Sequence, residues 1–395
     1  MKPFSIASDI HWVGALHPDL RIFDIIMKTK NGSTYNSYLL NADKTLLIDT
    51  VKSKFTDLFL QNISQLMDLE KLDYIVVQHT EPDHSGSLIA LLDKAPDAEI
   101  LCSKSAVKFV KNTINRDAKI TPVGDGSTID LGGKTLEFLQ TPFLHWPDTM
   151  MTYCHEDRLL FPCDVFANHF CDSRMFDDAI TRDFAPDFEL YFNIIFRPFK
   201  KNVQNALAKL GNFDVQMIAP SHGPIIRSSV HEVMTRYDQW SRPVPENSTP
   251  RCLVYYVSAH GNTEIMAKII TEALKQDNMD VELYDLTQIS IDEQLDNIEA
   301  CDAILVGSPT INNDAVKPVW ELLTSLTTLN LKGKLAASFG SIGWSGESVK
   351  FIDERLKALK FKVPFEGVTC KLVPDEEELQ SCRQLAHKVA ETIKA

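Results

Sequence analysis

The chain has 395 residues, of which 44% are hydrophobic and 9% are aromatic, and its formal net charge is −14 at pH 7. A chain of this size and composition is expected to form two or three globular domains with sizeable cores. The negative charge argues against a nucleic-acid surface or a polybasic membrane patch, and no run of roughly 18 apolar residues is present to span a membrane. Eight cysteines without a Cys-x-x-Cys pair, together with the lack of a signal-peptide core, predict a reduced protein of the cytoplasm.

In the first half of the chain, an apolar stretch at 74–77 predicts a buried strand. The six residues at 79–84, directly after it, read His-Thr-Glu-Pro-Asp-His. We expect this segment to be a loop at the strand end, where α/β proteins commonly place their chemistry. Its four candidate metal ligands are His79, Glu81, Asp83 and His84. Imidazole mixed with carboxylate, without cysteine, suits iron, manganese or catalytic zinc better than a structural zinc site.

Three further candidate ligands, His145, Asp164 and His222, each follow another apolar run. Alone, either histidine would more often be a hydrogen-bonded structural residue, and Asp164 could be a helix cap. Together the seven residues are too many for one metal ion. Three carboxylates and a bridging hydroxide would neutralise two divalent ions, so the sequence predicts a dinuclear site. Four further histidines of this half lack a strand-end context and are assigned to the surface or to positions behind the ligands: His11, His155, His169 and His231.

Residues 242–250 contain three prolines among small polar residues and predict a linker. We therefore predict two domains, 1–248 and 249–395. The second domain alternates apolar strands with helical patterns. The strands are expected at 252–257, 303–306 and 335–339, and the helices at 264–275 and around 349–359. This alternation predicts a doubly wound parallel sheet.

Three loops in the second domain indicate a flavin site. The loop 258–263 reads Ser-Ala-His-Gly-Asn-Thr before a helix and could cradle a monophosphate such as that of FMN, although a helix cap would explain it equally well. Two later loops, 307–313 and 340–346, also follow parallel strands, and Trp344 could stack on a flat ring. The candidate FMN-binding residues are Ser258, His260, Gly261, Asn262, Thr263, Ser308, Pro309, Thr310, Asn312, Asn313, Ser341, Gly343, Trp344, Ser345 and Gly346.

The ligand pattern of the first half resembles the metallo-β-lactamase fold, except that Glu81 stands where hydrolases of that fold carry histidine. A carboxylate at this position favours iron over zinc. The chain resembles the flavodiiron proteins, or type A flavoproteins, over essentially its whole length. The features that carry this resemblance are Glu81, the linker, and the segments 308–313 (Ser-Pro-Thr-Ile-Asn-Asn) and 343–346 (Gly-Trp-Ser-Gly).

This resemblance implies an α/β protein with an N-terminal metallo-β-lactamase-like αββα domain and a C-terminal flavodoxin-like domain. It also implies FMN and a non-haem diiron centre as cofactors. One iron would be held by His79, Glu81 and His145, and the second by Asp83, His84 and His222, with Asp164 bridging them. The chain would be the minimal two-domain form, without a rubredoxin or flavin reductase extension.

The function implied is an oxidoreductase that reduces dioxygen to water, nitric oxide to nitrous oxide, or both. Electrons would come from a separate carrier such as rubredoxin, through FMN. Reduced FMN and two reduced irons would hold the four electrons that dioxygen needs. Tyr191 is a candidate catalytic hydroxyl beside the ligands, although a core aromatic is the simpler interpretation.

The resemblance further implies a head-to-tail homodimer, or a dimer of dimers, in which the flavin of one subunit faces the irons of the other. Two alternatives remain at this point. One is a dizinc lactamase- or glyoxalase-like hydrolase fused to a flavodoxin module. The other is a non-catalytic electron carrier or oxygen sensor that uses the flavodoxin half alone.

Overall fold

The computed structural model describes all 395 residues and divides the chain into two compact units, Met1–Arg242 and Pro243–Ala395. These are called the N-terminal unit and the C-terminal unit below. The division falls inside the segment 242–250 from which the sequence predicts a linker, a few residues before the predicted boundary at 248/249. Each unit buries apolar cores of its own. None of the helices is long and apolar enough to cross a membrane.

The N-terminal unit contains two mixed sheets. The first sheet consists, in spatial order, of β1 (Phe4–Ala7), β2 (Ile10–Trp12), β7 (Tyr38–Asn41), β8 (Thr45–Ile48), β9 (Tyr74–Val77), β10 (Glu99–Ser103) and β11 (Ile120–Val123). The second consists of β12 (Thr128–Asp130), β13 (Thr135–Gln140), β14 (Met150–Cys154), β15 (Leu159–Phe161) and β16 (Met217–Ile218). Buried side chains of both sheets, such as Val76, Leu101 and Phe138, belong to one core, so the sheets pack face to face.

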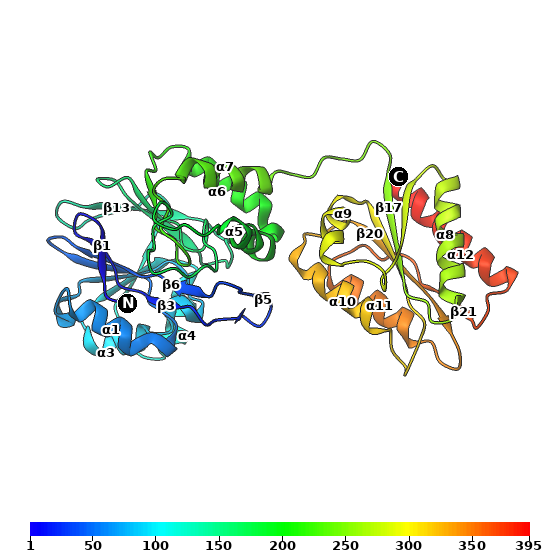
Figure 1. Cartoon of the computed structure of the whole chain (residues 1–395), viewed down its shortest axis with the longest axis horizontal. Helices are drawn as coiled ribbons and strands as arrows, with labels where there is room; N and C mark the ends of the chain where they lie inside the picture. The colour runs from blue at the N-terminus through cyan, green and yellow to red at the C-terminus, as the bar shows by residue number, and fades with distance from the viewer. The chain divides into compact units, whose positions relative to one another are not determined.

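Helices cover the outer faces of this sandwich. The longer helices are α1 (Thr56–Ser64), α3 (Leu88–Lys94), α4 (Ala106–Ile114), α5 (Ala185–Tyr191), α6 (Lys200–Leu210) and α7 (Val230–Ser241). Figure 1 shows α1, α3 and α4 beneath the sandwich and α5, α6 and α7 above it. This arrangement confirms the predicted αββα architecture. Single helical turns are η1 (Ser53–Phe55), η2 (Leu69–Lys71) and η4 (Arg197–Phe199), and a π-helical segment η3 (Phe192–Phe196) follows α5.

Two small antiparallel ribbons complete the N-terminal unit. One pairs β3 (Ala15–His17) with β6 (Ser33–Tyr35), and the other pairs β4 (Ile22–Phe23) with β5 (Met27–Lys28). The structure also corrects one sequence-based expectation. Residues 79–84 are not wholly a loop, because Pro82–Ser85 form the short helix α2. Proline fits the first position of a helix, since its missing N–H would have no partner there.

The C-terminal unit is a five-stranded sheet with parallel pairing throughout. Its strands, in spatial order, are β18 (Asp280–Asp285), β17 (Arg251–Tyr256), β19 (Ala303–Gly307), β20 (Leu335–Ile342) and β21 (Val368–Lys371). This is the strand order of flavodoxins, so the predicted doubly wound sheet is confirmed. The strands β17, β19 and β20 are almost entirely buried because helices cover both faces of the sheet.

The helices of this unit divide between the two faces. Side chains of α8 (Asn262–Gln276) and α12 (Glu376–Lys394) belong to one core, and those of α9 (Leu295–Ala300), α10 (Lys317–Ser325) and α11 (Glu347–Ala358) belong to the other. The two sets lie on opposite sides of the sheet in Figure 1. The turns η5 (Asp292–Gln294) and η6 (Leu326–Thr328) adjoin α9 and α10. The carboxyl ends of β17 and β19 are in register, with Tyr256 beside Gly307, and Gly307 lies beside Phe339 of β20, which continues to Ile342.

Candidate metal centre and flavin loops

The seven predicted metal ligands lie together in the N-terminal unit, although they come from distant parts of the sequence. The residues 79–84 follow β9 of the first sheet, and the remaining ligands belong to the second sheet: His145 lies between β13 and β14, and Asp164 follows β15. His222 follows β16. The apolar residues of these strands are buried in the core. The polar residues that follow the strands meet at one side of the sandwich.

The first group of ligands surrounds one carboxylate oxygen. The Nε2 atoms of His79 and His145 lie 3.1 Å and 3.0 Å from Oε2 of Glu81. The same two nitrogens lie 4.0 Å and 3.9 Å from Oδ2 of Asp164. Two imidazoles and two carboxylates therefore converge on one point.

The second group lies on the other side of Asp164. His222 Nε2 lies 3.1 Å from Oδ2 of Asp83, and His84 Nε2 lies 3.7 Å from Oδ1 of Asp83. Oδ1 of Asp164 lies 3.2 Å from His84 Nε2 and 3.4 Å from His222 Nε2. Asp164 thus turns one oxygen toward each group, which is the geometry that a carboxylate bridging two metal ions requires.

Three of the four histidines are held from behind through Nδ1. The Nδ1 of His222 is 2.6 Å from the carbonyl oxygen of Thr34. A carbonyl can only accept, so this Nδ1 carries the proton and Nε2 turns a lone pair toward the cluster. The Nδ1 atoms of the other two, His79 and His84, lie 3.3 Å from carboxylate oxygens of Asp148 and Asp49, respectively.

Sequence reasoning missed Asp49 and Asp148. Asp49 directly follows β8, so the strand-end criterion that selected the ligands would also have selected it. Asp148 follows no strand, and its carboxylate is fixed instead by the backbone N–H and hydroxyl of Thr80 at 2.9 Å and 2.6 Å. Both carboxylates orient ligand imidazoles rather than facing the cluster themselves.

Buried charge dominates the electrostatics of the cluster. Burial opposes protonation of His79, yet Asp148 and Glu81 outweigh it and raise the pKa of His79 to about 9. Burial also opposes ionisation of Asp164, but the nearby imidazole of His84 outweighs burial and holds the pKa of Asp164 well below its ordinary value. The pKa of His222 is raised in the same way, because Asp83 outweighs burial. The ionised carboxylates therefore need compensating positive charge nearby. Either protons on the imidazoles or metal ions that displace those protons can supply this charge.

The residues present fit a pair of metal ions. Both carboxylate oxygens of Asp83 and Nε2 of His84 are buried and form no hydrogen bond of regular geometry, so that their polar contacts are only the ion pairs with the other candidate ligands. Unpartnered atoms of this kind are costly inside a protein, and a cation at their common focus would satisfy them. All seven side chains are buried or nearly so, with the most exposed being His145 at 18%. The donor set of imidazole and carboxylate without thiolate suits iron.

Two aromatic residues lie directly beside this cluster. The hydroxyl of Tyr191, which is buried in α5, donates a hydrogen bond of 3.1 Å to Oδ1 of Asp164. His169 is 2% exposed, its ring lies 5.3 Å from that of His222, and its Nδ1 is 2.7 Å from the hydroxyl oxygen of Ser33. Of the two positions that the sequence left open for His169, the surface or behind the ligands, the structure shows the second. Its sequence context gave no signal, because no strand precedes it.

The three predicted flavin loops meet at the carboxyl edge of the C-terminal sheet. The hydroxyls of Thr263 and Ser341 lie 2.8 Å apart and join the first loop to the third. The backbone N–H of Thr310 donates a hydrogen bond of 3.0 Å to the carbonyl of Ser341 and joins the second loop to the third. The hydroxyl of Ser345 lies 3.5 Å from Oδ1 of Asn313.

The first of these loops fits a phosphate. Ser258 Oγ is buried without a hydrogen-bond partner, and the helix α8 begins just beyond the loop with no side-chain cap. The N-terminal amides of α8 are therefore free to bind an anion, beside a hydroxyl that also lacks a partner. Gly261 has φ +87° and an added Cβ would meet nothing within 4 Å, so the backbone there is open to a ligand.

The remaining candidate flavin residues differ in accessibility. Ser308 is buried, and its hydroxyl serves its own loop by donating to the carbonyl of Pro309 at 2.8 Å. Several others face solvent, with Trp344 83% exposed. An exposed indole at this edge is available to stack on the flat ring of a flavin. The exposed or half-exposed candidates are His260, Gly261, Asn262, Thr310, Asn312, Asn313, Gly343, Trp344, Ser345 and Gly346.

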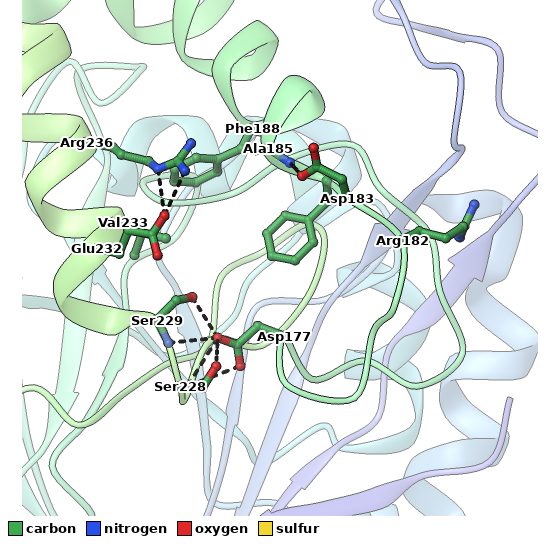
Figure 2. Close-up of a pocket in the computed structure, with 11 residues that line it drawn as sticks. Asp177, Arg182, Asp183, Ala185, Phe188, Ser228, Ser229, Glu232, Val233 and Arg236 are labelled. Carbon is green, nitrogen blue, oxygen red and sulfur yellow. Dashed lines mark hydrogen bonds and ion pairs between the residues drawn. The ribbon is translucent and has the colours of Figure 1, made fainter.

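A separate pocket of about 230 Å³ in the N-terminal unit contains none of the predicted ligands. Figure 2 shows Asp177 paired with Ser228 and Ser229, and Arg236 paired with Glu232. The carboxylate of Asp177 accepts hydrogen bonds of 2.7 Å from the hydroxyls of both Ser228 and Ser229, and Arg236 pairs with Glu232 at 2.7 Å. These carboxylates and this arginine are therefore paired within the protein.

Comparisons with known proteins match each half of the chain to a different family. Residues 34–223 match the ODP family of beta lactamases, and residues 254–385 match the flavodoxin family. The chain is 40% identical over 401 residues to the flavo-diiron protein FprA2 of Clostridium acetobutylicum, covering 100% of both chains. It is also 36% identical over 398 residues to a nitric oxide reductase of Moorella thermoacetica, covering 99% of each.

Solved structures give the same result. The rubredoxin oxygen:oxidoreductase of Desulfovibrio gigas superimposes with a TM-score of 0.72 and 30% identity, over 100% of this chain and 99% of that one. The flavodiiron protein of Giardia intestinalis superimposes with a TM-score of 0.71 and 29% identity, over 100% and 97%. The chain therefore belongs to the flavo-diiron proteins, a family of oxidoreductases whose cofactors are FMN and a non-haem diiron centre.

Proposed function

We propose that this chain reduces dioxygen to water, nitric oxide to nitrous oxide, or both, with electrons that pass through FMN from a separate carrier protein such as rubredoxin. The observation that carries the proposal is the placement of Asp164 between two ligand groups, one oxygen toward each. The irons would lie in those groups, His79, Glu81 and His145 in the first and Asp83, His84 and His222 in the second. When bound, the diiron centre and FMN supply the redox chemistry.

The chain's own residues would position and protect the reacting gas. Burial, reinforced by Asp164, raises the pKa of Tyr191 well above its ordinary value, so its hydroxyl keeps its proton. That hydroxyl already donates to Oδ1 of Asp164 and would donate a hydrogen bond beside the metal pair. Burial, reinforced by His222, lowers the pKa of His169 well below its ordinary value, so this ring stays neutral. The buried side chains around the cluster exclude water from the centre.

The alternative of a dizinc hydrolase is not favoured. The relatives that span the chain from end to end include a nitric oxide reductase, and they match both halves rather than the lactamase-like half alone. Glu81 also places a carboxylate in the first group, which shifts the donor set away from zinc. The eight unpaired, buried cysteines support a reducing cytoplasm as the location.

The decisive experiment is anaerobic stopped-flow of the reduced, purified protein against each gas. We expect about two irons and one FMN per chain, and rapid reoxidation of the flavin by at least one gas. Comparison of the two rates gives the preferred substrate. A protein that contains zinc and consumes neither gas would overturn the proposal.

We further infer that the active form is a head-to-tail homodimer, or a dimer of dimers, in which the flavin of one subunit serves the irons of the other. Mixing an Asp164→Ala subunit, which lacks the bridge, with a Ser258→Asp subunit, which repels the FMN phosphate, should restore activity, since one intact flavin–diiron pair forms across the interface. Verified heterodimers that stay inactive would contradict this arrangement, as would a strict monomer with the full rate.

A further inference from the structure

An amine, a thiol and a carboxylate meet at the end of the β13–β14 hairpin that lies away from the metal cluster. Lys134 directly precedes β13, Cys154 is the last residue of β14, and Asp157 lies in the turn that follows. The thiol is fully buried, and the side chains of Lys134 and Asp157 are 9% and 14% exposed. The candidate ligand His145 lies in the loop at the opposite end of the same two strands. The function proposed above uses none of the first three residues.

A single carboxylate oxygen joins the amine to the thiol. Nζ of Lys134 donates a hydrogen bond of 2.5 Å to Oδ2 of Asp157, and Sγ of Cys154 donates one of 3.2 Å to the same atom. The register of the strands, in which Leu136 pairs with Cys154, places the lysine and the cysteine at the same end of the hairpin. The nitrogen and the sulfur are therefore both within hydrogen-bond distance of one oxygen atom.

The two nucleophiles differ in how they are held. An ammonium group can donate three hydrogen bonds, and Asp157 is the one acceptor that the structure gives Lys134. Transfer of a proton along this bond leaves an amine with a free electron pair. Burial raises the pKa of the Cys154 thiol to about 12, so this thiol keeps its proton and is a poor target for ordinary thiol reagents. Any reaction of Cys154 therefore depends on the two groups beside it.

Dioxygen is the oxidant that this site suits. It is small and apolar, so it can enter a site that excludes large or charged oxidants. The partly exposed carboxylate of Asp157 places the cluster just below the surface. Oxidation of a buried thiol next to an amine also leads to a product that a lone thiol cannot form, because the nitrogen can trap the oxidised sulfur.

We propose that Lys134 and Cys154 form a cross-link in air, in which one oxygen atom joins Nζ to Sγ. Starting from the neutral amine, the S–H bond and one N–H bond break, S–O and O–N bonds form, and the O–O bond of dioxygen is cleaved. Thiol, amine and dioxygen give the bridge and one water, with two electrons taken from sulfur and two from nitrogen. Asp157 accepts the displaced protons and passes them to the departing oxygen.

An oxygen-containing bridge fits the geometry better than a direct S–N bond. The two atoms now contact the same carboxylate oxygen rather than each other, and an inserted oxygen spans a wider gap than a single bond does. The bridge would tie β13 to β14 by closing the loop between residues 134 and 154, which restricts the unfolded chain. The inference is independent of the proposed function, since it requires neither FMN nor iron.

The first test is mass spectrometry of the anaerobically purified holoprotein before and after exposure to air-saturated buffer, without an electron donor and with catalase present to remove peroxide. The peptides that contain Lys134 and Cys154 should become linked, with one oxygen atom more and two hydrogen atoms fewer than the separate peptides. A thiol reductant should restore the free side chains. Unlinked peptides, or a link that lacks the added oxygen, would overturn the inference.

Variants assign the role of each group. Lys134→Arg keeps the charge and Cys154→Ser keeps the size, but both should abolish the link. Asp157→Asn removes the proton acceptor and should slow its formation about a hundredfold. A rate in that variant equal to the parent's would show that the carboxylate takes no part.

A second lysine–cysteine pair in the chain is the internal control. Nζ of Lys334 donates to the carbonyl oxygen of Cys301, and the thiol of Cys301 donates to the carbonyl of Ile298 at 3.3 Å. No carboxylate joins this amine to this thiol, so the two should stay unlinked in the same digest. Equal linking of both pairs would indicate unspecific oxidation and would overturn the inference.

Hydrogen exchange measures the consequence for the fold. Exchange along β13 and β14 should be slower in the bridged protein than in the anaerobic protein, and the reductant should reverse this change. Exchange that stays the same in the linked protein would contradict the stabilising effect. A link formed in a protein that reduces neither gas would support this inference while the proposed function fails, whereas an active reductase without the link would overturn this inference alone.

Discussion

The candidate site of the N-terminal unit consists of buried ionisable side chains that contact one another. The candidate site of the C-terminal unit consists of loop hydroxyls and backbone amides that largely face solvent. His79, Asp83 and Asp164 are each at most 4% exposed. In the flavin loops, by contrast, Trp344 is 83% exposed and His260 and Asn312 are also exposed. One site is thus a charged cluster inside the fold, and the other is an edge of the fold.

This difference determines how each site should respond to substitution. Buried carboxylates need compensating charge, so in the N-terminal unit metal binding and folding energy are coupled. The flavin loops carry no buried charge cluster, and their backbone amides persist when one side chain is changed. We therefore expect large losses from single substitutions in the N-terminal unit and graded losses in the C-terminal unit.

The largest effect is expected for Asp164→Asn. An amide cannot supply two anionic oxygens, so the bridge between the ligand groups is lost. Iron should fall from about two per chain to less than one, and gas reduction should fall by more than about a hundredfold, while FMN content stays unchanged. Elemental analysis and the flavin absorbance measure the two cofactors separately. Asp97→Asn, at an 89% exposed carboxylate, is the control. Full iron occupancy in the Asp164 variant would contradict the bridging role.

Glu81→His should have the next largest effect. Oε2 of Glu81 is the point on which His79 and His145 converge, and an imidazole there recreates the ligand set of the hydrolases. The bound metal should shift from iron toward zinc, and gas reduction should fall about tenfold or more, since imidazole and carboxylate select different metals. Metal content is measured after growth with both metals supplied. An iron-to-zinc ratio equal to that of the parent would show that Glu81 does not select the metal.

Much of the candidate metal site could be located from the sequence because its candidate ligands share one local signature. Each of His79, Asp164 and His222 follows an apolar strand, and a buried strand is readable from a short hydrophobic run. His169 has no such context, and its burial arises from packing against Phe23 and Tyr191, which are remote in the chain. Contacts of this kind are tertiary and leave no local pattern.

The fold of the C-terminal unit was predictable for the same reason, but only where strands are covered on both faces. Three of its strands, β17, β19 and β20, are largely apolar and were expected. The sequence of β18 is Asp-Val-Glu-Leu-Tyr-Asp, and this strand lies at an edge of the sheet, where polar residues are tolerated. It was therefore missed, as was the edge strand β21. The β4–β5 ribbon was missed because two-residue strands carry no periodicity.

A smaller effect is expected for Ser258→Ala in the C-terminal unit. The hydroxyl of Ser258 is buried and lacks a partner, so it is available to a phosphate, but the amides at the start of α8 remain in the variant. FMN affinity should fall about tenfold or less, which corresponds to one hydrogen bond to a charged group. Fluorescence titration of the flavin-free protein measures it, and iron content should not change. A loss as complete as that of iron in Asp164→Asn would remove the contrast between the two sites.

The smallest effects concern stability, through one carboxylate of each unit. In the N-terminal unit, burial opposes ionisation of Asp177, but hydrogen bonds from Arg227, Ser229 and Ser228 outweigh it and lower its pKa below 3.8. The charged form thus stabilises the fold above pH 3.8, and this contribution is lost as the pH falls through the lowered pKa. In the C-terminal unit, burial raises the pKa of Asp353 above 3.8. There the folded state binds protons more readily, so stability rises as the pH falls through the raised pKa.

The variants Asp177→Asn and Asp353→Asn should therefore differ in sign. At pH 7 the first should lower the free energy of unfolding by about 1 kcal/mol, because an amide cannot accept the same set of hydrogen bonds, and the loss should shrink toward pH 3. The second should leave stability unchanged or raise it by up to about 1 kcal/mol at pH 7, and that gain should also shrink in acid. Calorimetry of the metal-free protein at several pH values, with hydrogen exchange to assign each transition to its unit, measures both. A change of stability in the same direction at pH 7 for both substitutions would contradict this difference between the two units. The hydrogen bonds at Asp177 would then stabilise the charged carboxylate no better than the surroundings of Asp353 do.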